Sequence, residues 1–154
     1  MTTVLAVDLG SASGRVLAGT LTDGRLEVTD IHRFKHEARR REDGTLTWDV
    51  ATMEAETING LTKALEQFPD ARAVSIDTWG VDWAPLDEDG RLVGDVIAYR
   101  DERTSRTLDA FRERIADREF FDLTGNQPAT INTANQLFAF LREDPEAASR
   151  VAAA

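Results

Sequence analysis

The strand, turn and strand predicted over residues 4–20 constrain the fold more than any other feature of this chain. A run of small and β-branched apolar residues from Val4 to Val7 leads into Asp8, a short polar stretch follows, and a second apolar run begins at Val16. This pattern predicts two strands joined by a tight turn. Backbone N–H groups and hydroxyls in such a turn are able to converge on phosphate oxygens. A carboxylate at the strand end is suited to hold Mg²⁺, largely through water, so Asp8 is the predicted metal residue.

The turn has an ordinary structural explanation as well, because Asp and Gly are common wherever a strand ends. The complete string from Asp8 to Arg15, D-x-G-S-x-S-G-R, favours the phosphate interpretation because it lies directly between two strands of buried character. It is neither a Walker A loop nor a dinucleotide-binding fingerprint. Its nearest match is the phosphate hairpin of the actin-like ATPase superfamily, which includes sugar kinases.

Composition limits the classes of partner. The chain has 154 residues, of which 42% are hydrophobic, and one compact unit is the expected organisation. A formal net charge of −10 argues against a nucleic-acid surface, which needs clustered Lys and Arg. There are no cysteines, so disulfides and thiolate metal sites are excluded. Neither a signal peptide nor a membrane-spanning apolar run is recognisable, and we expect a soluble cytoplasmic protein without membrane contacts.

The rest of the pattern predicts an α/β domain. Residues 25–34 indicate a third antiparallel strand with Leu26, Val28 and Ile31 facing inward. Residues 49–68 indicate a helix capped by Asp49 and ended by Pro69, with an apolar stripe that includes Ile58 and Leu65. A short buried strand is expected over residues 73–76 and a charged helix over 104–115. Together these elements predict a mixed sheet with antiparallel hairpin strands and crossover helices.

Two further stretches are rich in polar groups. Residues 76–83 combine two carboxylates, a threonine, two indoles and a glycine, which suits a sugar site but is equally explained by core tryptophans and turn aspartates. Residues 99–104 carry side chains of both signs, either for a ligand or as an ion-paired surface turn. His32 and His36 have i,i+4 spacing, but on a strand or loop this does not favour a metal site.

Five strings in order resemble the amino-terminal domain of the FGGY carbohydrate kinases, from about Thr3 to the end of the chain. They are the hairpin at residues 8–15, I-H-R-F at 31–34, T-W-D-V at 47–50, and I-D-T-W-G-V-D at 76–82, followed by A-Y-R-D-E-R-T at 98–104. Within that family, the strings at 31–34, 47–50 and 76–82 are most similar to the members that act on L-rhamnulose. The resemblance implies an actin-like (ribonuclease H-like) fold and transfer of a phosphoryl group from ATP, with Mg²⁺, to the 1-hydroxyl of L-rhamnulose.

The resemblance also implies roles for individual residues. Asp8 stands near the metal. The expected contacts with the ATP phosphates are Ser11, Ala12, Ser13, Gly14 and Arg15, and the expected contacts with the sugar are Gly80, Asp82, Trp79 and Arg103. The family's catalytic aspartate and adenosine pocket belong to a part of the sequence that follows this chain, so no catalytic base is assigned within residues 1–154. We therefore expect a truncated amino-terminal kinase domain that is inactive alone.

Two other interpretations remain open at this stage. One is an FGGY kinase for another ketose or a sugar alcohol. The other is a non-catalytic sugar-binding or interaction fragment. A missing second domain would leave part of the interdomain face uncovered, so we also expect self-association.

Overall fold

The computed structural model describes residues 1–153 and divides the chain into two compact units rather than the single unit expected from its length. The first unit comprises residues 1–37 and 49–80, and the second comprises residues 38–48 and those from 81 onward. The elements that carry the predicted phosphate hairpin all belong to the first unit. Each unit has its own sheet and its own buried apolar cluster.

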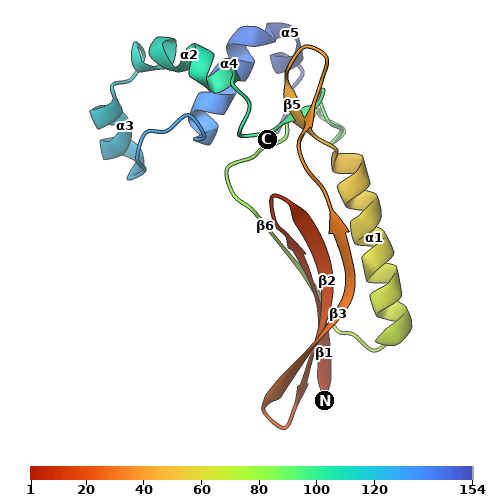
Figure 1. Ribbon diagram of the computed structural model, residues 1–154. Coiled ribbons are helices and arrows are strands. Elements are labelled where there is room, and N and C mark those ends of the chain that lie inside the picture. The colour runs from red at the N-terminus through yellow and green to blue at the C-terminus, as the bar shows by residue number, and fades with distance from the viewer. Residues whose placement is uncertain (154) are drawn as a thin grey trace. The chain divides into compact units, whose positions relative to one another are not determined.

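The first unit contains a four-stranded mixed sheet with strand order β3-β2-β1-β6 (Figure 1). β1 and β3 each pair antiparallel with β2, whereas β6 pairs parallel with β1. This arrangement confirms the predicted mixed sheet with a hairpin at its start. The strands are β1 (Thr2–Leu9), β2 (Ser13–Thr22), β3 (Arg25–Lys35) and β6 (Val74–Thr78).

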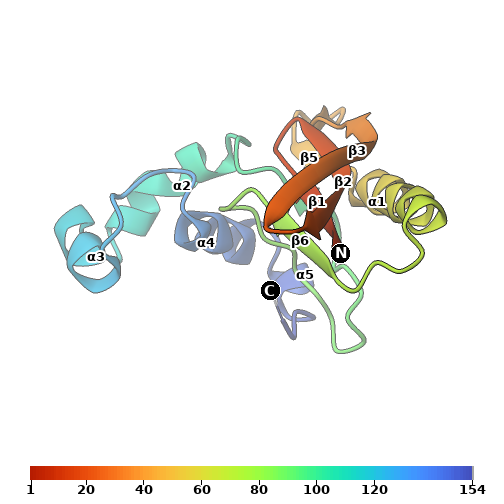
Figure 2. The same cartoon turned by 90° about the horizontal axis from the view of Figure 1, so that it is seen from below.

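Helix α1 (Val50–Gln67) runs along one face of this sheet (Figure 2). It begins as the sequence predicts, because an Asp49 carboxylate oxygen accepts a hydrogen bond from the Thr52 amide at 3.0 Å. A Cβ atom at Gly60 would lie 2.5 Å from Val16 Cγ2, so glycine lets the helix approach β2 closely. The core between helix and sheet is built on Leu5, Val7, Val16, Ala18 and Ala64.

Several side chains expected to face the core are exposed. Leu26 and Val28 on β3 are 61% and 57% exposed, because their register places them on the sheet face opposite α1. β6 was expected to be buried, yet all five of its residues are exposed. α1 packs on β1, β2 and β3, and so leaves Val74 and Ile76 on β6 uncovered. The apolar pattern identified the elements correctly but overestimated how much of each is covered.

The second unit contains a small antiparallel sheet with strand order β4-β5-β7, together with four helices within the described residues. Helices α2 and α4 lie side by side (Figures 1 and 2), and the Phe111 ring of α2 packs edge-on against Phe120 and Phe138 at 6.0 and 5.4 Å between centroids. None of the helices in residues 1–153 has the length and apolar character that spanning a membrane requires. The elements are β4 (Arg39–Arg40), β5 (Leu46–Trp48), β7 (Val96–Ile97), α2 (Arg103–Arg112), α3 (Asp117–Thr124), α4 (Thr133–Glu143) and α5 (Pro145–Ala148).

Candidate functional site

The predicted phosphate turn lies between β1 and β2 and is open to solvent. The Gly10 amide donates to the Ser13 carbonyl at 2.9 Å, which closes the turn, and the amide of His36 donates to the Ala12 carbonyl at 3.3 Å. Ala12 and Ser13 are exposed, and Ser11 is half-buried. The turn therefore presents small side chains and two hydroxyls at the end of the sheet, as the sequence predicted.

Asp8 faces a cation across the hairpin. Its Oδ2 atom accepts a hydrogen bond from Arg15 Nε at 2.7 Å and forms an ion pair with Nη2 at 2.6 Å, and both side chains are somewhat less than half exposed. The antiparallel register explains this contact, because Asp8 and Arg15 are directly opposed on β1 and β2. A positive group and the carboxylate predicted to bind the metal thus stand together beside the turn.

Asp77 is a second carboxylate at this end of the sheet. It pairs in register with Asp8 on the neighbouring parallel strand, so both side chains belong to the same face. Asp77 belongs to the polar stretch of residues 76–83, whose sequence pattern assigned it no role. The signal that could have found it is the parallel pairing of β1 with β6, which aligns the two strand ends. No group of three or more metal-binding side chains occurs among residues 1–153.

Gly14 has a structural reason to be glycine. It is buried, and a Cβ atom there would lie 2.6 Å from Cε1 of the Phe34 ring on β3. The Phe34 ring in turn lies 5.9 Å from the ring of His36. The Phe34 ring therefore occupies the space that a side chain at position 14 would need.

Trp79 and Gly80 follow the end of β6. The Trp79 amide donates to the Leu9 carbonyl at 3.1 Å, and its ring stacks on His36 at 5.5 Å between centroids. Burial lowers the pKa of His36, and a hydrogen bond to the Gly10 backbone opposes this shift. Gly80 is exposed, and nothing lies within 4 Å of a Cβ atom built there. A ligand therefore has unobstructed access to the backbone at Gly80.

In the second unit, the Asp82 carboxylate accepts hydrogen bonds from two segments that are distant in the sequence. One carboxylate oxygen accepts from the Trp48 indole at 2.8 Å and the other accepts from the Tyr99 amide at 2.7 Å. The preceding residue, Val81, has a φ of 78°, which is unusual for a β-branched residue. The Val81 carbonyl accepts hydrogen bonds from Gln136 Nε2 at 2.8 Å and Thr133 Oγ1 at 3.2 Å. Such strained backbone is typical of functional loops.

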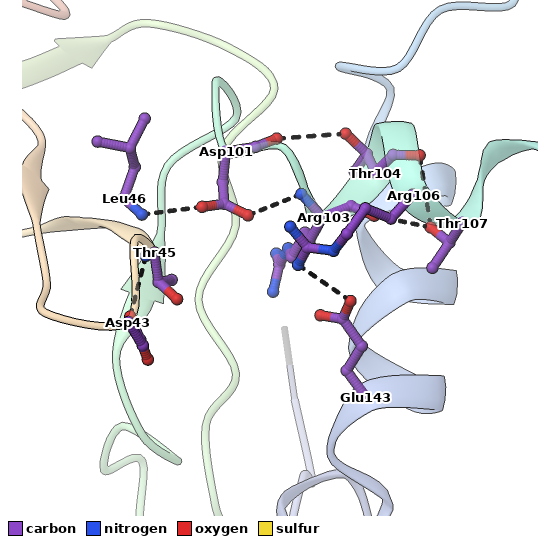
Figure 3. A network of polar contacts seen from close by, with 9 residues as sticks. All are labelled: Asp43, Thr45, Leu46, Asp101, Arg103, Thr104, Arg106, Thr107 and Glu143. Atoms are coloured by element: carbon purple, nitrogen blue, oxygen red, sulfur yellow. Dashed lines mark hydrogen bonds and ion pairs between the residues drawn. The ribbon is translucent and has the colours of Figure 1, made fainter.

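Arg103 does not lie on a surface turn, one of the two possibilities left open by the sequence. Arg103 and Asp101 are only 6% and 7% exposed. Asp101 accepts from the Leu46 amide and the Arg103 amide, both at 2.8 Å, and so joins β5 to the start of α2 (Figure 3). Arg103 also lines a partly open cavity of about 280 Å³, and all the residues that line it belong to the second unit.

Comparison with known proteins identifies the family. Residues 3–154 match the model of the N-terminal domain of the FGGY family of carbohydrate kinases. Rhamnulokinases from Klebsiella pneumoniae strain 342 and Mannheimia succiniciproducens are 40% and 37% identical over 150 residues, covering 96% of this chain but only 30% and 31% of those proteins.

Solved structures agree on the fold. A gluconate kinase from Lactobacillus acidophilus has a TM-score of 0.79 at 13% identity, covering 97% of this chain and 30% of that one. Glycerol kinase from Plasmodium falciparum, solved with ADP, has a TM-score of 0.78 at 17% identity, with the same coverage. The fold is therefore that of these sugar kinases, as the hairpin and mixed sheet predicted. With the match over residues 3–154, the chain belongs to the FGGY family of carbohydrate kinases.

Proposed function

We propose that this chain supplies the phosphate-binding and sugar-binding part of an ATP-dependent kinase that phosphorylates the 1-hydroxyl of L-rhamnulose. The similarity to proteins named rhamnulokinase supports the sugar, and the hairpin supports the nucleotide. The observation that carries the proposal is the position of Asp8, which ends β1 beside an open turn of small residues and in register with Asp77. The chain spans about 30% of the length of these relatives, and we assign the catalytic base to the remainder of such a kinase.

The donor set at the hairpin fits Mg²⁺. Carboxylate oxygens with access for water are what this ion prefers, and Asp8 is 40% exposed, with Asp77 beside it. Mg²⁺ would neutralise charge on the transferred phosphoryl group when bound. In the proposal, Ser11, Ala12, Ser13 and Gly14 offer backbone and hydroxyl donors to the ATP phosphates, and the cation of Arg15 faces the same anionic group.

For the sugar we propose contacts from Gly80, Trp79 and Asp82. Gly80 contributes space, because no atom lies within 4 Å of where its side chain would be. Trp79 contributes a flat ring for C–H groups, and Asp82 contributes carboxylate acceptors whose direction is fixed by Trp48 and Tyr99. The resemblance gives Arg103 the same role, but its buried position in a cavity supports a different ligand.

Calorimetric titration of the 154-residue chain with ATP in the presence of Mg²⁺ tests the nucleotide half of the proposal. We expect binding that is lost in Asp8→Ala and retained in Asp30→Ala. The control removes a carboxylate that is also ion-paired with an arginine, Arg33, but lies on β3 outside the hairpin. Equal affinity in both variants would contradict the assignment of Asp8.

Titration with L-rhamnulose, with a second ketose and with a sugar alcohol tests the substrate half. We expect L-rhamnulose to bind best, and Gly80→Ala to weaken its binding without changing the thermal stability of the chain. A coupled ADP-release assay should show no turnover by the chain alone. Turnover abolished by Asp8→Ala would show that the chain itself supplies the base. Sugar binding with no nucleotide binding would favour a non-catalytic sugar-binding module.

The proposal includes self-association of the isolated chain. Val74 and Ile76 on β6 are 53% and 59% exposed, and exposed apolar groups on a sheet favour contact between copies. Sedimentation velocity should show mass increasing with concentration, and a Val74→Thr/Ile76→Thr double variant should reduce that increase. A monomer at every concentration would contradict this part of the proposal.

A further inference from the structure

The cavity in the second unit contains an arginine whose side chain makes no hydrogen bond to the described residues, although carboxylates lie near it. Arg103 is only 6% exposed, and it lines the cavity. Within residues 1–153, the only hydrogen bonds of Arg103 are made by its backbone, to Asp101 and Thr107. The five N–H donors of its guanidinium therefore have no acceptor in the described chain. Burial lowers the pKa of Arg103, opposed by the charges of Asp101, Glu143 and Asp82, but an arginine remains cationic at neutral pH.

The carboxylates that line the same cavity each already have a donor. Asp101 accepts two backbone amides, and Asp144 accepts the Ala147 amide at 2.9 Å. Glu143 pairs with Arg106 at 3.2 Å, as Figure 3 shows, and Asp95 pairs with Arg41. The guanidinium of Arg103, which has only donors, therefore still requires an acceptor.

A second residue that lines the cavity, Trp83, also has a donor without an acceptor. The Trp83 indole N–H is buried and has no hydrogen-bond partner in residues 1–153. Its ring packs edge-on against Phe140 at 5.3 Å between centroids, and both rings line the cavity. The cavity thus combines the unpaired donors of Arg103 with an aromatic wall, and its volume of about 280 Å³ exceeds that of several water molecules.

From these observations we infer that the cavity is a binding site for a small organic oxyanion, a carboxylate or a phosphate monoester, held by the Arg103 guanidinium. An oxyanion supplies two acceptors in the geometry that a guanidinium fork matches. The carbon part of the ligand lies against Trp83 and Phe140. This site is separate from the hairpin, because every residue that lines it belongs to the second unit.

The test uses the 154-residue chain and NMR of its three tryptophan indole N–H groups, one of which belongs to Trp83. Glycerol 3-phosphate, succinate and inorganic phosphate are titrated at constant ionic strength, with neutral L-rhamnulose for comparison. We expect an oxyanion to shift the Trp83 signal, which Trp83→Phe assigns. Comparing glycerol 3-phosphate with succinate distinguishes a phosphate monoester from a carboxylate as the preferred group.

Substitutions then locate the contact. Arg103→Gln should weaken oxyanion binding about tenfold or more, as expected when charge-assisted hydrogen bonds are lost, and Arg103→Lys should weaken it less. Arg118→Gln is the matched control, because this exposed arginine pairs with Asp122 on α3 and does not line the cavity. Arg15→Gln separates the cavity from the hairpin, and should leave the Trp83 shift intact.

If Arg103→Gln does not fold, the wild-type titration still decides the matter. A Trp83 shift with glycerol 3-phosphate or succinate, saturating and unaffected by Arg15→Gln, supports the site. Absence of a shift with all three oxyanions, or a shift with L-rhamnulose alone, would overturn it. Loss of ATP binding in Asp8→Ala does not bear on this result. The proposed nucleotide site at the hairpin and the proposed oxyanion site in the cavity are therefore tested independently.

Discussion

Arg15 binds the carboxylate of Asp8 through both Nε and Nη2, across the hairpin that joins β1 to β2. The pair is partly exposed, and such ion pairs contribute about 0–1 kcal/mol to stability. The importance of the Arg15–Asp8 pair is therefore that it holds the positive Arg15 guanidinium beside the turn. In the ligand-free chain the arginine neutralises the carboxylate that we propose as the metal residue.

From this contact we predict that Arg15→Gln changes the free energy of unfolding by less than about 1 kcal/mol but weakens MgATP binding about tenfold. Urea denaturation and calorimetry measure the two quantities. Arg33→Gln, which breaks the exposed pair with Asp30 on β3, should change stability by a similarly small amount and leave MgATP affinity unchanged. A large loss of stability with unchanged MgATP affinity would show that the pair is structural.

A second prediction concerns Gly14 and the ring of Phe34. A methyl group at Gly14 would lie 2.6 Å from Phe34 Cε1, so Gly14→Ala should destabilise the chain by about 1–3 kcal/mol through overpacking. Adding Phe34→Leu should recover part of this loss, which a double-mutant cycle detects. Gly80→Ala is the control, since its methyl group enters open space and should leave the melting temperature unchanged.

The third prediction tests the strained backbone at Val81, where φ is 78°. Glycine adopts this conformation freely, whereas alanine retains the strain. Val81→Gly should therefore be more stable than Val81→Ala by about 1 kcal/mol. Equal stabilities in thermal melts would mean that the loop relaxes without its side chain.

Gln136 ties α4 to this loop and is 1% exposed. Its Nε2 atom donates to the Val81 carbonyl at 2.8 Å and to the Ile131 carbonyl at 3.0 Å. Gln136→Leu leaves both acceptors without this donor and should cost about 1–3 kcal/mol for each one that stays buried. Thr133→Val, which removes a longer hydrogen bond from an exposed side chain, should cost less than Gln136→Leu. Chemical denaturation of the two variants compares them directly.

The chain should become less stable as the pH decreases through the range in which His36 takes up a proton. Burial lowers the pKa of folded His36, so the unfolded chain, with an ordinary value of about 6.5, takes up the proton first. The contribution of neutral His36 to the free energy of unfolding is fully present above about pH 6.5. It is lost as the pH falls toward the lowered pKa of His36 in the folded chain. The slope attributable to His36 is at most about 1.4 kcal/mol per pH unit.

Urea unfolding between neutral and mildly acidic pH measures this slope. His36→Gln should flatten it, whereas His32→Gln removes the other histidine and should leave the His36 part of the slope in place. His32 contacts Glu56 and Lys63 on α1, so its replacement is expected to change stability at every pH. A slope unchanged by His36→Gln would contradict the assignment.

Elements defined by local pattern were predictable from the sequence. The hairpin at residues 8–15, the helix capped by Asp49 and the strand over residues 25–34 each appear at or within a few residues of the expected bounds. Their signals are short-range, because turn glycines, cap side chains and apolar periodicity act within a few residues of the chain. The short strings that resemble the FGGY family are local for the same reason.

Only the tertiary structure decided which faces are covered and which distant groups meet. The exposure of Leu26 and Val28 depends on where α1 lies, and the alignment of Asp77 with Asp8 depends on strand pairing across about 70 residues. The burial of Arg103 depends on how β5, α2 and α4 pack together. The sequence by itself thus determined the elements and the chemistry each one carries. Folding determined which of those groups lose contact with water, because burial and register arise from contacts between segments far apart in the chain.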